Sequence, residues 1–238
     1  MKSIKKRYFI AGTDTDVGKT MIACALLAKA RSQGLTTAAV KPVAAGCIDT
    51  KDGLRNDDAE QLLAQCTMPL YYEQVNPIAF IDPIAPHIAA QKEGRRMQVD
   101  RLIGYTSGVL MQGANFTLVE GAGGWRVPVN ERETLADLAI GLSIPVVLVV
   151  GMRLGCINHA LLTIDAIARD GLKLAGWVAN CVDPKMAELD ANITTLKNRI
   201  NAPMLGLVPN LATEESSLSR VVACQAYVNL DLLLNESS

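Results

Sequence analysis

Short apolar runs alternate with longer segments of helical pattern along the whole chain. The helical patterns fall near residues 19–33, 99–113, 134–142, 158–169 and 186–200. Several of the apolar runs carry no polar position, as expected for parallel strands that are covered on both faces. The order therefore predicts an α/β fold with a doubly wound, mostly parallel sheet between two layers of helices. The predicted strands are Tyr8–Ala11, Thr37–Val40, Phe116–Val119, Val146–Val150, Leu174–Ala179 and Met204–Val208.

Composition and charge narrow the classes of function. The 238 residues include 23 basic and 24 acidic side chains, and a net charge of −1 argues against nucleic acid or membrane-surface binding. No signal-peptide pattern is present, and the longest apolar runs are too short to span a bilayer. The six cysteines are scattered and only two histidines occur, which favours a reduced, cytoplasmic protein without a zinc site. No linker or repeat divides the chain, so we expect a single domain over residues 1–238.

The first predicted strand runs into a loop rich in Gly, Thr and Asp, and a helical pattern follows. Backbone N–H groups at such a helix start bind phosphate. The strict phosphate-loop spacing requires glycine where this chain has Thr13, while Gly12 lies one residue earlier. The strand–loop–helix context still predicts nucleotide binding, with Lys19 on the β- and γ-phosphates and the Thr20 hydroxyl on Mg²⁺. The residues expected to bind nucleotide here are Asp16, Val17, Gly18, Lys19 and Thr20.

Two carboxylates lie where a phosphate-bound metal could reach them. Glu120 directly follows a predicted strand, and Gly121, Ala122 and Gly123 then let the backbone approach a ligand closely. Asp58 follows a long polar loop, Cys47–Asn56, and precedes a predicted helix, where an acidic residue is common for dipole reasons alone. Together with Thr20 these groups form an oxygen-only set, which suits Mg²⁺ that bridges phosphates.

Lys41 ends the second predicted strand and is followed by Pro42. A lysine at this point often only enters solvent. However, proline disfavours helical geometry at the preceding residue, so we expect Lys41 to project over the strand ends towards the phosphates. A second cation beside Lys19 would stabilise the charge that develops during phosphoryl transfer.

Two further segments follow predicted strands. Gly155, Cys156, Ile157 and Asn158 precede a predicted helix over residues 159–168. We expect Asn158 to be its N-cap, and the N–H groups of such a start can bind a carboxylate, although a capped helix without a ligand is commoner. Asn180 ends another strand, where a nucleotide base would lie. Asp183 leaves the preference for adenine or guanine open, since the guanine-reading pattern also requires a lysine that this chain lacks.

These motifs resemble those of the dethiobiotin synthetases, which bind ATP in a P-loop NTPase fold. The resemblance extends to about residue 210 and is poor over residues 212–225. It implies an ATP-dependent ligase of biotin biosynthesis that acts as a homodimer with its active site at the subunit interface. The matching segments are Gly12–Thr20, Lys41–Ala44, Leu54–Ala59, Val119–Trp125, Leu154–Ala160 and Gly176–Asn180.

The resemblance also implies roles for individual residues. It makes Lys41 and Lys19 catalytic and assigns the metal to Thr20, Asp58 and Glu120. It assigns the diamine to Thr15 and Asp16, where many members have Glu instead of Asp16, and to Ala45, where members commonly have a hydroxyl residue. The substrate carboxylate is assigned to Gly155, Cys156, Ile157 and Asn158 of the other subunit, and adenine to Asn180, Pro209, Asn210 and Leu211.

The reaction implied by the resemblance closes a ureido ring. CO₂ adds to one amine of 7,8-diaminopelargonate and forms a carbamate, whose oxygen attacks the γ-phosphate of ATP. The second amine then displaces phosphate from the carbamic–phosphoric anhydride, which gives dethiobiotin, ADP and phosphate. Two alternatives stay open, a dimeric P-loop ATPase switch and a diverged paralogue with another substrate. A corrinoid amidoligase is disfavoured because 238 residues leave no room for a glutaminase domain.

Overall fold

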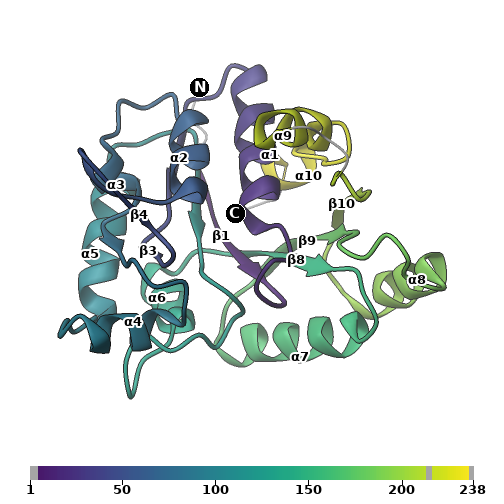
Figure 1. Cartoon of the computed structure of the whole chain (residues 1–238). Coiled ribbons are helices and arrows are strands. Elements are labelled where there is room, and N and C mark those ends of the chain that lie inside the picture. The colour runs from purple at the N-terminus through teal and green to yellow at the C-terminus, as the bar shows by residue number, and fades with distance from the viewer. Residues whose placement is uncertain (1–4, 213–215, 236–238) are drawn as a thin grey trace.

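The computed structural model describes residues 5–212 and 216–235 (Figure 1). Within these residues a six-stranded sheet has the order β10-β9-β8-β1-β7-β2, and every neighbouring pair is parallel. The predicted α/β class and all six predicted strands are confirmed. Their bounds are β1 (Lys6–Gly12), β2 (Thr37–Val40), β7 (Phe116–Glu120), β8 (Val146–Gly151), β9 (Leu174–Asn180) and β10 (Met204–Val208).

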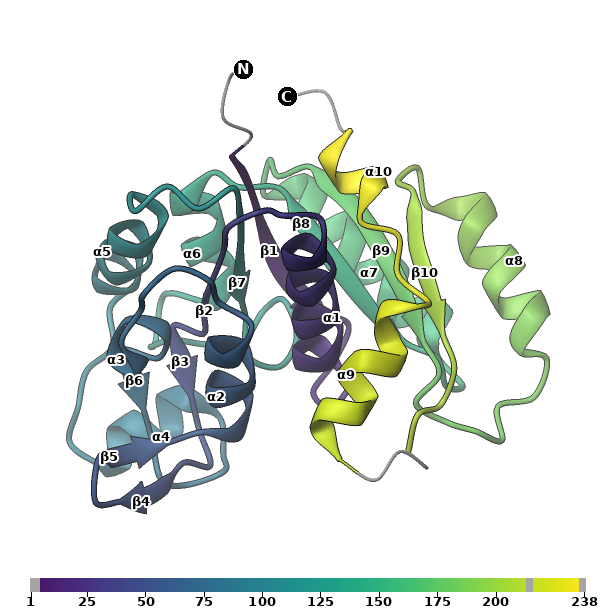
Figure 2. The same ribbon diagram turned by 90° about the horizontal axis from the view of Figure 1, so that it is seen from above.

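Helices cover both faces of this sheet (Figures 1 and 2). One apolar cluster holds side chains from α1 (Lys19–Ser32), α2 (Asp57–Ala64), α3 (Tyr72–Val75), α9 (Ser217–Gln225) and α10 (Asp231–Leu234). A second cluster holds side chains from α4 (Pro86–Lys92), α5 (Val99–Leu110), α6 (Leu135–Leu142), α7 (Cys156–Arg169) and α8 (Leu189–Arg199). In the described residues, no helix is long and apolar enough to cross a membrane.

Burial on both faces explains the continuous apolar runs. Every residue of β8 is buried, and its neighbours β1 and β9 are buried over nearly their whole length. A strand inside such a sheet has no solvent-facing side, so alternation of polar and apolar positions is lost. The parallel register also brings the carboxyl ends of all six strands to one edge, where the loops that carry the polar motifs lie together.

Several local expectations were wrong. The supposed loop Cys47–Asn56 contains an antiparallel hairpin of β4 (Ile48–Thr50) and β5 (Gly53–Arg55). Helix α7 begins at Cys156, after Gly155 in a left-handed conformation with φ 92°, so Asn158 lies inside the first turn and is not the N-cap. The unpredicted pair β3 (Val43–Ala44) and β6 (Ile78–Ala79) is too short for a periodic pattern to reveal.

Candidate active site

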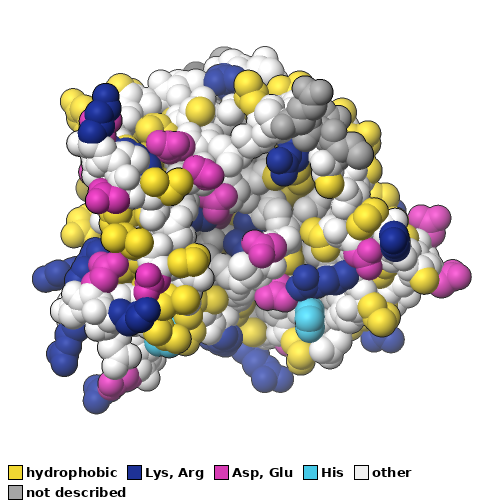
Figure 3. Space-filling view, in the orientation of Figure 1, with side chains coloured by type: hydrophobic (Ala, Val, Ile, Leu, Met, Phe, Trp, Pro, Cys, Tyr) yellow, Lys and Arg dark blue, Asp and Glu magenta, His cyan; other side chains and the backbone are white. Residues whose placement is uncertain are grey.

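A cavity of about 1260 Å³ opens at the carboxyl ends of β1, β2 and β7. Figure 3 shows this face hollowed near its centre, with acidic and basic side chains gathered at the hollow. Small-molecule sites commonly measure about 300–1,000 Å³, so the cavity can hold a nucleotide together with a second small substrate. Its lining includes Thr15, Asp16, Gly18, Lys19, Thr20, Lys41, Ala45, Asp58, Glu120, Ala122 and Gly123, all of which the sequence predicted as site residues.

The loop between β1 and α1 requires glycine at two positions. A Cβ atom on Gly12 would lie 2.8 Å from the Val17 side chain and 2.9 Å from the Asp14 carbonyl oxygen. Gly18 has a φ of +87°, and a Cβ atom there would lie 2.3 Å from the Asn180 amide nitrogen. Gly12 thus supplies the close approach that the strict spacing expects one residue later. The departure at Thr13 leaves the loop intact.

Lys19 is buried at the start of α1, and its Nζ donates to the carbonyl oxygen of Asp14 at 3.0 Å. Burial lowers the pKa of this ammonium below its usual value. At the exposed crown of the loop, Asp16 has a φ of 55°, a left-handed conformation that aspartate tolerates better than most residues. Thr15 and Asp16 of the loop and Lys19 of α1 all line the cavity.

Lys41 forms ion pairs with two carboxylates that line the cavity, Asp58 and Glu120. Its Nζ lies 2.8 Å from Asp58 Oδ2 and 2.7 Å from Glu120 Oε1. Burial alone would lower the pKa of Lys41, but Glu120 and Asp58 outweigh it and raise the pKa above the usual range. Burial likewise opposes ionisation of Asp58, yet Lys41 holds the pKa of that carboxyl below its usual value. Thr20 completes the cluster, because its hydroxyl donates to Glu120 Oε1 at 2.8 Å.

The backbone of Lys41 is held by a residue that the sequence did not indicate. The side chain of Asn76 donates to the Lys41 carbonyl oxygen at 2.8 Å, and the Lys41 N–H donates to the Val75 carbonyl oxygen at 2.7 Å. Asn76 is itself buried beside the end of α3. No local pattern marks Asn76, since its role depends on contact with Lys41, which lies 35 residues earlier in the chain.

The donor set of the cluster suits a magnesium ion that is shared with a nucleotide. Glu120 Oε2 is buried without a hydrogen-bond partner in the described part of the chain, so this carboxylate has a free oxygen. Thr20, Asp58 and Glu120 offer only oxygen, which Mg²⁺ prefers. Among the described residues, no group of three or more His, Cys, Asp and Glu side chains could hold a metal alone. Phosphate and water would have to complete the coordination.

Comparison with known proteins decides the family. A family model described as an AAA domain matches residues 6–216. The ATP-dependent dethiobiotin synthetase of Cellvibrio japonicus is 58% identical over 231 residues, which cover 97% of this chain and 99% of that protein. The synthetase of Pseudomonas paraeruginosa is 60% identical over 205 residues, which cover 86% of this chain and 90% of that protein. The chain belongs to the dethiobiotin synthetase family.

Solved structures with little sequence similarity share the fold of this chain. The cobyrinic acid a,c-diamide synthase of Mycobacterium smegmatis, solved with ADP and magnesium, has a TM-score of 0.56 and 16% identity, with 93% of this chain and 92% of that chain covered. A ParA family ATPase of Chlorobium tepidum has a TM-score of 0.53 and 14% identity, with 97% and 99% covered. At such identities the likeness concerns the fold alone, and the P-loop NTPase-like architecture is confirmed.

The other predicted nucleotide-binding residues do not line this cavity. Asn180 is buried, and its amide donates to the Val17 carbonyl oxygen at 2.8 Å. Gly121 packs against the ring of Phe9. Pro209, Asn210 and Leu211 follow β10, and none of them lines the cavity.

The segment predicted to bind the substrate carboxylate also lies outside this cavity. Gly155, Cys156, Ile157 and Asn158 form the start of α7, beside the nucleotide loop. An ion pair between Arg153 and Asp14, which the sequence did not indicate, joins the two segments. The cavity wall holds one more unpredicted group, Ser216, Ser217 and Arg220 at the start of α9.

Proposed function

We propose that this cavity is where the chain carries out the reaction of its family, the ATP-dependent conversion of 7,8-diaminopelargonate and CO₂ into dethiobiotin, ADP and phosphate. The observation that carries the assignment is the cluster of Lys41, Asp58, Glu120 and Thr20 at the end of the nucleotide loop. It combines a buried cation with a carboxylate pair suited to a metal, which phosphoryl transfer requires.

The charges of the site define the role of each group. Lys19 and the N–H groups at the start of α1 would hold the β- and γ-phosphates. Mg²⁺ held by Thr20, Asp58 and Glu120 would neutralise phosphate charge. The raised pKa of Lys41 keeps its ammonium protonated at neutral pH. Lys41 therefore acts as a positive charge that stabilises the phosphoryl group in the transition state, and not as a base.

The diamine would lie between the crown of the loop and an apolar wall. The carboxylate of Asp16 can accept hydrogen bonds from an amine, and the Thr15 hydroxyl lines the same side. Ala44, Ala45 and residues 83–86 also line the cavity, and their apolar side chains suit an aliphatic chain. The methyl group of Ala45 offers no hydrogen bond, so Thr15 and Asp16 would bind the polar end of the diamine without it.

A second copy of the chain would complete the site. The start of α7 does not line the cavity of its own chain, although its N–H groups are suited to a carboxylate. Leu154, directly before it, is 94% exposed, and Leu162 on α7 is 61% exposed. Exposed leucines beside a functional segment favour a protein interface. We therefore assign the chain to a homodimer in which the partner supplies Gly155–Asn158.

The proposal extends to the setting of the enzyme. All six cysteines are free, as expected for a reducing cytoplasm. The sheet draws its strands from both halves of the chain, which supports one domain over residues 1–238. Adenine binding by Asn180, Pro209, Asn210 and Leu211 also stays part of the proposal, since these residues lie at the ends of β9 and β10.

The test is ADP release by the purified protein with Mg²⁺, ATP and bicarbonate, with and without 7,8-diaminopelargonate. We expect strong stimulation by the diamine and formation of dethiobiotin. Slow hydrolysis that does not change with the diamine would contradict the proposal and favour an ATPase switch or a paralogue with another substrate.

A further inference from the structure

The first turn of α9 forms part of the cavity wall. Three basic side chains line the cavity, Lys19, Lys41 and Arg220. Lys41 is paired with two carboxylates, and Lys19 donates to the loop backbone. Arg220 is exposed, and among the described residues its guanidinium group takes part in no ion pair or hydrogen bond, although its backbone N–H donates to the Ser216 carbonyl oxygen. We propose that Arg220 binds the α- and β-phosphate part of the nucleotide and sets the affinity for it.

Contacts at its far end hold α9 in place. Lys29 of α1 donates to the carbonyl oxygens of Gln225 at 3.3 Å and Val228 at 2.5 Å. Directly after α9 the chain joins β10, because the Asn229 N–H donates to the Leu205 carbonyl oxygen at 2.6 Å. A Cβ atom on Gly206 would lie only 2.2 Å from the Tyr227 carbonyl oxygen, so this approach requires glycine. These contacts therefore hold α9 in the position in which its first turn lines the cavity.

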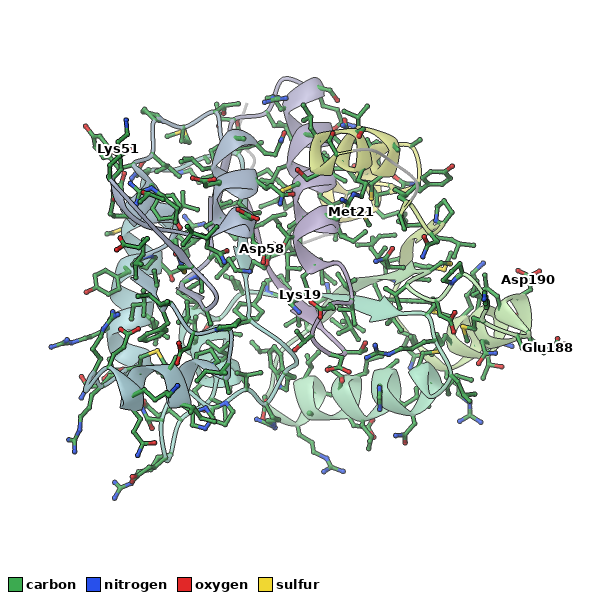
Figure 4. The ribbon with its side chains drawn as sticks, viewed as in Figure 1. Lys19, Met21, Lys51, Asp58, Glu188 and Asp190 are labelled. Atoms are coloured by element: carbon green, nitrogen blue, oxygen red, sulfur yellow. The ribbon has the colours of Figure 1, made fainter. Side chains whose placement is uncertain are left out.

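The order of the strands places Arg220 opposite the catalytic cluster. Lys41 follows β2 and α9 follows β10, and these strands are the two edges of the described sheet. Figure 2 accordingly shows α2 and α9 on opposite sides of α1. Met21, one residue beyond Thr20, also lines the cavity, and Figure 4 shows it on α1 next to α9. A phosphate bound beside Met21 and α9 would lie away from Lys41, and hence away from the γ-phosphate, which reacts.

The side-chain chemistry agrees with this position. A guanidinium group forms two parallel hydrogen bonds to a phosphate, and it stays charged at every working pH. The Ser216 hydroxyl caps α9 by accepting from the Ser219 N–H at 3.1 Å, so the positive end of the helix dipole lies beside the same cavity. Asp57 and Glu60 line the cavity from α2. Their carboxylates disfavour an anion there, so the α9 side is the more favourable place for a phosphate.

This inference rests on the proposed binding of ATP, and its test measures nucleotide affinity without the diamine. Titration calorimetry would compare ATP and ADP binding to the full-length protein and to Arg220→Ala, Arg220→Gln and Arg220→Lys. We expect Arg220→Ala and Arg220→Gln to weaken both nucleotides by the same factor of about ten, as for loss of hydrogen bonds to a charged group. Arg220→Lys should lie in between, and kcat at saturating ATP should change less than about twofold.

Arg199→Ala is the matched control, since Arg199 is exposed on the last turn of α8 and does not line the cavity. Unchanged affinity for both nucleotides in Arg220→Ala and Arg220→Gln would overturn the inference, as would weakening of ATP alone, which indicates the γ-phosphate. Thermal unfolding identifies a misfolded variant. The affinities of the other Arg220 variants then decide whether the inference holds. A wild-type protein that binds nucleotide without diamine-dependent turnover contradicts the proposed function but leaves this test valid.

Discussion

Lys41 Nζ lies 2.7 Å from Glu120 Oε1, and both side chains are buried. The two residues are 79 positions apart in the chain and meet because β7 pairs with β2. A buried ion pair contributes little net stability, whereas removal of one partner leaves an uncompensated charge. Loss of either residue should therefore lower both the stability of the fold and the activity of the site.

We expect Lys41→Met to abolish most diamine-dependent turnover while nucleotide binding persists. Loss of a positioned charge next to the phosphoryl group reduces kcat by about 10²–10³-fold. The unpaired Glu120 should also destabilise the fold by about 3–5 kcal/mol. Steady-state ADP release and urea unfolding measure the two effects.

The control is Lys51→Met, since Lys51 is exposed at the turn between β4 and β5 (Figure 4). Lys51→Met should match the wild-type protein in both assays. A Lys41→Met protein with unaltered kcat would remove Lys41 from the mechanism.

Asp58 should contribute to stability in a pH-dependent way. Its pKa is held below the usual value by Lys41, so the contribution is present above about pH 4 and is lost as the pH falls through the lowered pKa. The difference in urea midpoint between the wild-type protein and Asp58→Asn should thus be larger at pH 7 than at pH 3. Equal differences at both pH values would show that Lys41 does not favour the ionised carboxylate.

Asn180→Ala should weaken the binding of both ATP and GTP. The substitution removes the donor for the Val17 carbonyl oxygen, and a backbone group left unpaired costs about 1–3 kcal/mol. The loop would then hold phosphate less well whichever base is attached. Weaker binding of ATP alone would show that Asn180 acts only through its proposed contact with adenine and not through the loop. Asn192→Ala on α8 is the control, because it loses a similar side-chain to backbone hydrogen bond, to Glu188.

Leu154→Asp should convert a dimer into a monomer. A charge at a fully exposed leucine costs nothing in the free chain but is unfavourable inside an interface. We expect light scattering to report half the wild-type mass, and the KM for the diamine to rise at least about tenfold with unchanged ATP affinity. Met111→Asp, at a residue that is 78% exposed, should retain the wild-type mass. A monomeric wild-type protein would contradict the homodimer.

Much of the fold could be predicted because its signals are local. The apolar runs mark all six strands of the central sheet within a few residues, since parallel strands buried on both faces lose their polar positions. The nucleotide loop was also evident, although its glycine lies at Gly12 instead of position 13. By contrast, α9 was not predicted, because it follows a stretch without a clear pattern.

Errors at the site arose where backbone geometry overrides residue preference. Asn158 is a good N-cap residue, but Gly155 takes up the left-handed conformation and α7 starts at once. Asn76 and Arg153 were missed for another reason. Their partners, Lys41 and Asp14, lie 35 and 139 residues away, and no spacing rule connects such positions.

The sequence by itself determined the α/β class, the phosphate-binding loop and the membership in a family of ATP-dependent synthetases. These properties follow from periodicity, turn residues and motifs, which involve residues that are close together in the sequence. Only the tertiary structure decided that Lys41 meets Asp58 and Glu120, that Thr20 donates to Glu120 across 100 residues, and that Arg220 lines the cavity. These contacts depend on the order of strands in the sheet, and packing of the whole chain sets that order.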